Sequence, residues 1–447
     1  MIIWVVAAYF ALLLLIGFVF RNSKSIHDYI LAERKLSLPI LVASIVTAFY
    51  GATAILGGAE LSYFFGLGAL WFMIPFYIGN ILVLSYSEKI TASKAETLPD
   101  FLGQFYGSRV VVASTLLLTF LCLVPESIIA AGKLMHYLYP LSVELWMTLV
   151  ALVVITYTLL GGLRAIAYSD VLQFMLMVAA LAVVVPYAIA YSPDFIAKTP
   201  GENLSPIPYL RMFPQDAIRW TILLVFMPIT AAPLYQRFFA SMPSVNKKKA
   251  ILYSVAIYFA IDMIVLCAGM IAAANSEALG ITEANADIAL LILGFNILSK
   301  PLRILLALGL LAAIMSTADS WTHSGASSLS YDLLQRMGNF SEKTLILASR
   351  FFVFALGLLS LILALYFQDI ITALVFLLTV WTSGILLPTL AALSGRRLSE
   401  RAALASIFVG GTSSILWGLY PLYAIDPLFV GLFLAFAASA LAQASGN

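Results

Sequence analysis

Apolar segments of about twenty residues recur along almost the whole chain, and they limit what it can fold into. A helix needs about 20 apolar residues to cross a bilayer core of roughly 30 Å. We count thirteen such segments in the 447 residues, of which 62% are hydrophobic and 10% are charged. A soluble domain would carry roughly 25% charged residues. The sequence therefore predicts an all-α polytopic membrane protein and excludes a water-soluble enzyme. The expected spans are 2–20, 38–59, 66–86, 110–139, 141–160, 168–191, 217–240, 250–274, 301–334, 345–367, 370–392, 402–419 and 428–444.

The sequence lacks the motifs that several other classes of protein need. Cys122 and Cys267 are far apart, and the three histidines form no HExxH motif, so a metal or redox enzyme is not indicated. The net charge of +2 is too small to indicate a nucleic-acid partner. No Walker motif is present. Any uphill transport must therefore use an ion gradient.

The distribution of basic residues predicts the orientation. Arg21 and Lys24 follow the first span directly and no basic residue precedes it, so its N-terminus is expected outside. Alternating the loops from there places 18 of the 24 Lys and Arg on the cytoplasmic side, Arg237 among them. The chain is predicted to run N-out and C-in. The 13-residue apolar segment 286–298 is too short to span and is expected to pack on the bundle as a short external helix.

Two spans at matching positions are rich in helix-breaking residues. The span 38–59 contains Gly51, Gly57 and Gly58, and the span 217–240 contains Pro228 and Pro233. Interrupted helices at corresponding places in two halves are typical of transporters built from inverted repeats. We therefore expect one membrane domain, 1–447, in two repeats. The predicted parts are an extra helix at 2–20, repeats at 38–191 and 217–392, and two extra helices at 402–444.

Polar residues inside the spans need a reason, because an intramembrane carboxylate costs about 2.5–3.5 kcal/mol on insertion. Ala313, Ser316, Thr317 and Ser320 share one helical stripe, and Asp319 flanks it. Hydroxyls, carbonyls and a carboxylate are hard donors that suit a small alkali cation. Packing of small residues between helices would explain the hydroxyls but not the carboxylate.

Three further carboxylates lie within spans and leave alternatives open. Asp170 could bind an ion or pair with Arg164 near the interface. Glu126, after Pro125, could hold a cationic group, carry a proton or pair with Lys133. Asp262 has no evident partner in its own span.

Three stretches resemble the sodium:solute symporter family. They are GGLRAIAYSDVLQF at 161–174, AAIMSTADS at 312–320 and YQRFFAS at 235–241, which are similar to the family's fifth, eighth and sixth core helices. The resemblance implies a LeuT-type core of five plus five helices in inverted repeat. It also implies a sodium site between the first and eighth core helices, formed by the carbonyls of Thr47, Tyr50 and Ala313 and the hydroxyls of Ser316 and Thr317.

The same resemblance implies a second sodium site and a solute site. The second ion would bind Asp170 with Ser316, Ser320 and Asp319, where an Asp at 319 departs from the Ser of some such sites. The solute would lie at mid-membrane. Its expected lining is Phe49, Thr53, Glu126, Ser127, Met227, Thr230, Trp381 and Ser383. Phe49 and Ala54 stand where sugar carriers have polar side chains, so an amino acid, carboxylate or amine is favoured over a sugar.

These observations predict a sodium-coupled symporter that imports a small organic solute by alternating access. The expected location is the cell membrane, as a multi-pass protein. The expected partners are Na⁺, the solute and the bilayer, with no nucleic acid and no obligate protein partner. A proton-coupled carrier on the same fold, or a transporter-like solute sensor, are the alternatives.

Overall fold

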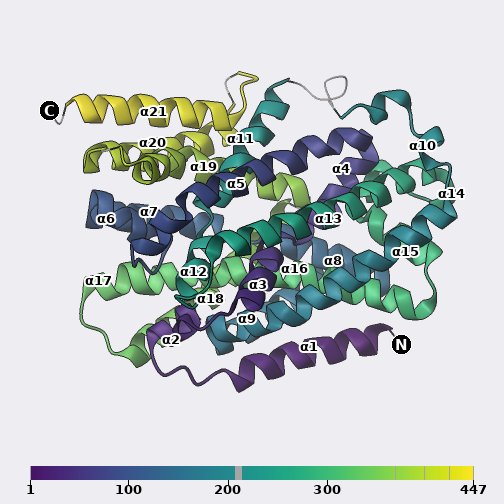
Figure 1. The fold of residues 1–447 in the computed structure, drawn as a ribbon, viewed down its shortest axis with the longest axis horizontal. Coiled ribbons are helices and arrows are strands. Elements are labelled where there is room, and N and C mark those ends of the chain that lie inside the picture. The colour runs from purple at the N-terminus through teal and green to yellow at the C-terminus, as the bar shows by residue number, and fades with distance from the viewer. Residues whose placement is uncertain (1, 207–213, 368, 397, 422, 446–447) are drawn as a thin grey trace.

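The helices lie side by side along the long axis of the molecule (Figure 1). The structure is a computed structural model that describes residues 2–206, 214–367, 369–396, 398–421 and 423–445. Arg211 and Arg397 of the charge count, and part of the predicted connection 192–216, lie outside these ranges. Within them the chain forms helices and turns, with one isolated bridge between Leu36 and Ser241.

The helices in the described part of the chain range from single turns to a 49-residue stretch. In chain order they are α1 (Ile2–Val19), α2 (Ile26–Leu31), α3 (Leu38–Phe49), α4 (Gly58–Phe65), α5 (Leu70–Ala92), α6 (Leu98–Tyr106), α7 (Ser108–Leu121), α8 (Pro125–Leu138), α9 (Val143–Tyr191), α10 (Phe195–Lys198), α11 (Pro214–Thr230), α12 (Ala232–Ala240), α13 (Lys247–Ala274), α14 (Ser276–Leu279), α15 (Ala289–Ile297), α16 (Lys300–Ser328), α17 (Gln335–Met337), α18 (Glu342–Phe367), α19 (Ile370–Ser394), α20 (Glu400–Leu419) and α21 (Pro427–Ala444). Short 3₁₀ or π turns are η1 (Ala32–Arg34), η2 (Thr53–Gly57), η3 (Gly66–Ala69), η4 (Gly201–Leu204), η5 (Glu283–Ile288) and η6 (Leu329–Leu334).

Eleven helical stretches in the described residues are long and apolar enough to cross a membrane. One of them, α9, has 49 residues, and a straight helix of that length would be about 73 Å long. Gly162 breaks its helical geometry with φ 59° and ψ −165°, so α9 contains two segments that match two predicted spans. The count of thirteen spans and the N-out orientation remain predictions. α1 begins and α21 ends at opposite ends of the long axis, as an odd number of crossings requires (Figure 1).

Both helices with matched Gly or Pro residues are interrupted, as predicted. α3 stops at Phe49, and a π turn over η2 leads into α4. α11 stops at Thr230, Ala231 adopts an extended conformation, and Pro233 lies in the first turn of α12. A third interruption separates α7 from α8 at 122–124, just before Pro125 and inside the predicted span 110–139.

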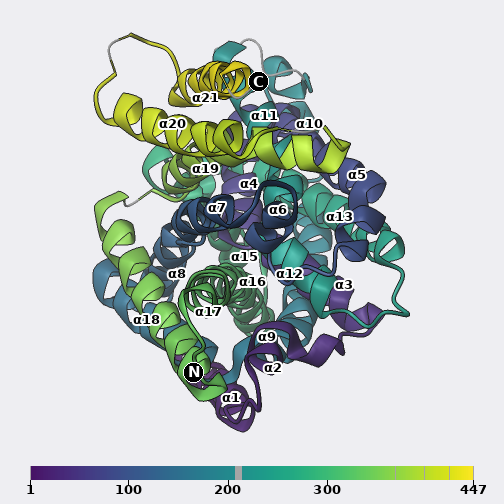
Figure 2. The ribbon, with the colours of Figure 1, turned by 90° about the vertical axis from the view of Figure 1, so that its left-hand side faces the viewer.

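α16 runs through the middle of the bundle and carries the polar stripe. Every residue from 309 to 328 is buried, and the helix packs against α9, α18, α8 and α3. The nine-residue α15 packs on α13, α9 and α16, so the short apolar segment is a packed helix, as expected. α1 on one side and α20 with α21 on the opposite side flank the core (Figure 2). The repeat boundaries remain a prediction.

Candidate ion and solute sites

The break after α3 brings its end into close contact with α16. A Cβ at Gly51 would lie 2.2 Å from Oγ1 of Thr317 and 2.6 Å from its Cβ, so no larger residue fits without a shift. Because α3 ends at Phe49, carbonyls of its last turn are free to accept from side chains of α16. Thr47 accepts from Thr317, and Ala48 accepts from Trp321. Carbonyls exposed in this way next to a hydroxyl-bearing helix are suitable ligands for a cation.

Four predicted sodium ligands form a cluster at this contact, which we call the oxygen cluster (Thr47, Ala313, Ser316 and Thr317). The Thr317 hydroxyl lies 2.8 Å from the Thr47 carbonyl and 3.3 Å from the Ala313 carbonyl. The Ser316 hydroxyl lies 3.3 Å and 3.0 Å from the same two carbonyls. Tyr50 starts the break beside this cluster. The ligands are neutral oxygens, so an alkali ion would be the only full charge among them.

A cavity adjoins the oxygen cluster. Of the eight predicted solute residues, Phe49, Thr53, Glu126 and Met227 line it. Thr317 lines it too and therefore belongs to both sites. Oε2 of Glu126 and Oγ1 of Thr53 are buried and have no hydrogen-bond partner. Unsatisfied buried polar atoms facing a cavity are the groups that a polar ligand would satisfy.

The other four predicted solute residues do not line the cavity. Ser127 donates to Oε1 of Glu126 at 3.0 Å, and Thr230 donates to the Phe226 carbonyl at 2.9 Å. Trp381 is fully buried, and Ser383 packs towards Gly431 of α21. The α19 residues that do line the cavity are Leu374, Leu377 and Leu378, together with Trp321 from α16.

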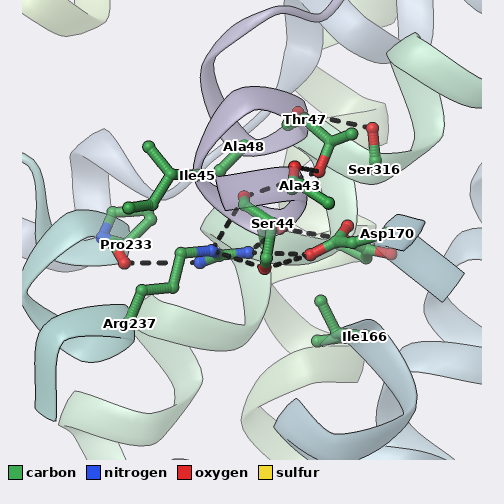
Figure 3. Close-up of polar contacts among 12 residues, drawn as sticks. Ala43, Ser44, Ile45, Thr47, Ala48, Ile166, Asp170, Pro233, Arg237 and Ser316 are labelled. Atoms are coloured by element: carbon green, nitrogen blue, oxygen red, sulfur yellow. Dashed lines mark hydrogen bonds and ion pairs between the residues drawn. The ribbon is translucent and has the colours of Figure 1, made fainter. Parts of the chain in front are cut away.

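The predicted second sodium site contains a buried arginine. Arg237 reaches from α12 to Asp170 on α9 and Ser44 on α3 (Figure 3). Its guanidinium lies 3.2 Å from Oδ2 of Asp170 and 2.5 Å from the Ser320 hydroxyl. The Ser44 hydroxyl also donates to Asp170. We call this group, with Asp319 and Tyr157, the Arg237 cluster.

The Arg237 cluster has more negative than positive charge. Asp319 accepts hydrogen bonds from Tyr157 at 2.7 Å and from Ser320 at 3.1 Å. Asp170, Asp319 and Arg237 are all fully buried, and Oδ1 of Asp170 has no hydrogen-bond partner. Two carboxylates face one guanidinium, so one more cation or proton would balance the cluster.

The sequence analysis counted Arg237 among the cytoplasmic basic residues, and the structure shows that its side chain is fully buried and paired with Asp170. The suggested Asp170–Arg164 pair was wrong. Arg164 instead lies 3.4 Å from Asp28 and 3.2 Å from Glu33. The pairing of Arg237 with Asp170 had one signal in the sequence. Arg237 is the lone arginine of the YQRFFAS motif and lies on a helix next to a Pro break.

The remaining intramembrane carboxylates also find partners far along the chain. Lys133 pairs with Asp287, so its suggested pairing with Glu126 was wrong. Asp262 on α13 accepts hydrogen bonds from the hydroxyls of Tyr50, at 2.5 Å, and Tyr77. A helical wheel cannot show contacts between residues 154 to 212 positions apart.

The family assignment follows from a comparison with known proteins. Residues 29–410 match the sodium:solute symporter family. The high-affinity proline transporter PutP of Bacillus subtilis (strain 168) is 28% identical over 97% of this chain and 96% of that protein. A Na⁺-coupled sialic acid symporter has a similar structure, with a TM-score of 0.81, 17% identity, and 99% and 97% of the two chains covered. MhsT in complex with L-phenylalanine superimposes with a TM-score of 0.59, 15% identity, and 93% and 99% covered.

The chain belongs to the sodium:solute symporter family. Its fold is the LeuT-type transporter fold, as the sequence predicted. It is accordingly a sodium-coupled symporter of small organic solutes and not an enzyme.

Proposed function

We propose that the solute carries a protonated amine, as an amine or amino acid does, and that Glu126 binds it. The observation that supports this is the buried, unpartnered Oε2 of Glu126 in the wall of the cavity. No Lys, Arg or His is among the described residues that line the cavity. A free carboxylate would lack a counter-charge there, and a sugar would meet mostly apolar walls.

Sodium binds, in this proposal, to the oxygen cluster with Tyr50 completing it. The ion would hold the end of α3 against α16, and Thr317 would transmit that constraint to the cavity because it belongs to both sites. Sodium entry gains about 2.3 kcal/mol per 100 mV of membrane potential for each charge moved inward. This free energy would drive solute accumulation across the plasma membrane.

The transport step would be a rocking movement of the interrupted helices. α3 with α4, and α11 with α12, have breaks at which backbone geometry changes without disrupting a continuous helix. Helices such as α9, α16 and α18 pack tightly on one another and would form the static part. Alternating exposure of one central site is the mechanism that such interrupted repeats support.

The test is uptake of radiolabelled amines and amino acids, L-proline included, into proteoliposomes under a sodium gradient. Glu126→Gln should abolish most uptake, since it removes the charge and keeps the shape. Glu144→Gln on the exposed surface of α9 makes the same chemical change outside the cavity and should leave uptake unchanged. Undiminished uptake by Glu126→Gln would contradict the assigned role.

The coupling ion at the Arg237 cluster has two candidates, a second sodium ion or a proton. The excess carboxylate and the unpartnered Oδ1 of Asp170 support a second cation of either kind. Asp319→Asn leaves one carboxylate facing Arg237 and does not touch the oxygen cluster. If sodium binds there, the Hill coefficient for sodium should fall from near two to near one in this variant. If a proton binds, wild-type sodium activation is hyperbolic, uptake rises as the pH falls, and Asp319→Asn removes that pH dependence.

A further inference from the structure

A second lobe adjoins the solute cavity, and Phe49 lines both. Phe49, Thr53, Met227 and Leu374 line both the lobe that contains Glu126 and a neighbouring lobe that contains Asp262. The four shared wall residues place these lobes next to each other, and we call the pair of lobes the chamber.

Each lobe of the chamber contains one buried carboxylate. Glu126 is 5% exposed and its Oε2 has no partner. Asp262 is 2% exposed, and both tyrosine hydroxyls that it contacts donate to Oδ2. Hydroxyl donors satisfy hydrogen bonds but do not neutralise a charge. No Lys, Arg or His occurs among the described lining residues of either lobe.

The lobe with Asp262 is walled by aromatic rings. Phe49, Tyr50, Phe72, Phe76 and Trp220 line it. The ring centroids of Phe49 and Phe76 are 5.5 Å apart, and those of Phe72 and Trp220 are 5.1 Å apart. Aromatic faces attract cations, most strongly where water is excluded. A carboxylate surrounded by such faces is a site for an organic ammonium group.

We propose that the chamber binds a small aliphatic solute with two cationic groups, one at Glu126 and the other at Asp262. The apolar residues between the carboxylates would contact the alkyl chain. The inference rests on the proposed function and narrows its substrate class from amines in general to dications. The sodium ion, at the oxygen cluster, is a separate charge.

A zwitterionic amino acid fits this chamber less well. Its ammonium could bind one carboxylate, but its own carboxylate would meet no basic lining side chain, and the second acidic residue would keep its charge. A dication instead pairs both acids at once. Proline is the solute in the name of the relative, the high-affinity proline transporter PutP. L-Proline is therefore the zwitterion whose affinity should be compared with that of the diamines.

The experiment measures binding by the purified full-length protein in sodium chloride and in potassium chloride. The probes are 1,4-diaminobutane, 1,5-diaminopentane, butylamine and L-proline, titrated by thermal stabilisation. We expect a diamine to bind roughly tenfold tighter than butylamine or more, in sodium only, because it makes a second charge-assisted contact.

Two variants locate the second contact. Asp262→Asn keeps the side-chain size and should reduce diamine affinity to the level of butylamine, with butylamine itself unchanged. Tyr77→Phe removes a hydroxyl next to Asp262 but keeps the carboxylate, so the diamine preference should persist. If Asp262→Asn does not fold, the wild-type ligand series still decides the question.

The outcomes separate the two proposals. Sodium-dependent binding in which butylamine or L-proline equals the diamines overturns the dication inference and leaves the proposed function standing. A diamine preference that survives in Asp262→Asn also overturns the inference. No sodium-dependent binding of any amine overturns both.

Discussion

Two polar clusters lie one helical turn apart on α3. One consists of neutral groups, and the other contains charged side chains. The oxygen cluster contains Thr47, and its hydroxyls and carbonyls are all neutral. The Arg237 cluster contains Ser44, two carboxylates and a guanidinium. A neutral cluster costs little to bury and leaves a bound ion as the main charge. A charged cluster must supply a counter-charge, and Arg237 supplies one for two carboxylates.

The comparison implies that the sodium ion of the oxygen cluster and the stability of the fold depend on different clusters. Removal of a hydroxyl from the oxygen cluster should remove sodium binding with a modest cost to the fold. Removal of Arg237 should cost the fold itself. The following variants test this division, beginning with the largest expected effect.

Arg237→Met should destabilise the protein by about 3–5 kcal/mol, because it leaves buried carboxylates without a partner. Unfolding of the detergent-solubilised protein measures the change. Adding Asp170→Asn to this variant should recover part of the loss. Lys248→Met breaks the exposed ion pair with Glu88 and should leave the free energy of unfolding nearly unchanged, because solvent screens the pair. Equal effects of the two single variants would refute the division.

Thr317→Val should remove the stabilisation by sodium at the oxygen cluster and leave the fold nearly as stable in potassium. At a sodium concentration 100 times its dissociation constant, the expected loss is about 2.7 kcal/mol. The control is Thr322→Val on the same helix, where the hydroxyl is buried without a partner. That variant should keep the full sodium effect. A sodium effect left undiminished by Thr317→Val would contradict an ion at the oxygen cluster.

These expectations also show what the sequence could reveal. The helix breaks were predictable because Gly51 and Pro233 act on the backbone at their own positions. The polar stripe with Ser316 and Thr317 was predictable because it lies on a single helix. Both are local features. The cluster partners of Asp170 were not predictable from one helix, because Arg237 is 67 residues away. An arginine near a span end has an interfacial explanation until tertiary packing shows otherwise.

The lining of the solute cavity was likewise predictable only in part. Glu126 was accessible to sequence reasoning because a carboxylate after a proline inside a span is unusual. Trp381 and Ser383 were assigned to the lining by resemblance, whereas the structure places leucines of α19 at the wall. Which face of α19 points inward depends on how α20 and α21 cover the other face, and no periodicity within α19 contains that information.

Gly51→Ala tests whether close contact between α3 and α16 is needed for the oxygen cluster. The added methyl group would lie 2.2 Å from Oγ1 of Thr317, so the helices must separate. Overpacking of this kind costs about 1–3 kcal/mol, and sodium stabilisation should disappear with it. Gly57→Ala is the matched control, because its Cβ would meet no atom closer than 3.5 Å. Loss of the sodium effect in the control alone would contradict the assignment.

His27 and Glu96 form a third charged contact. Because it is partly exposed, it can be compared with the fully buried Arg237 cluster to test whether burial sets the size of the effect. His27 Nδ1 lies 2.8 Å from Glu96 outside the spans, with Arg34 and Glu342 nearby. The hydrogen bond to Glu96 raises the pKa of His27, against the lowering effect of burial. A pKa raised by folding stabilises the protein below the ordinary value of 6.5, and this stabilisation is lost as the pH rises through the raised pKa. His27→Gln should therefore reduce stability below pH 6.5 by less than about 1 kcal/mol and have little effect at alkaline pH. A pH-independent loss, or one as large as that of Arg237→Met, would show that burial does not set the size of these effects.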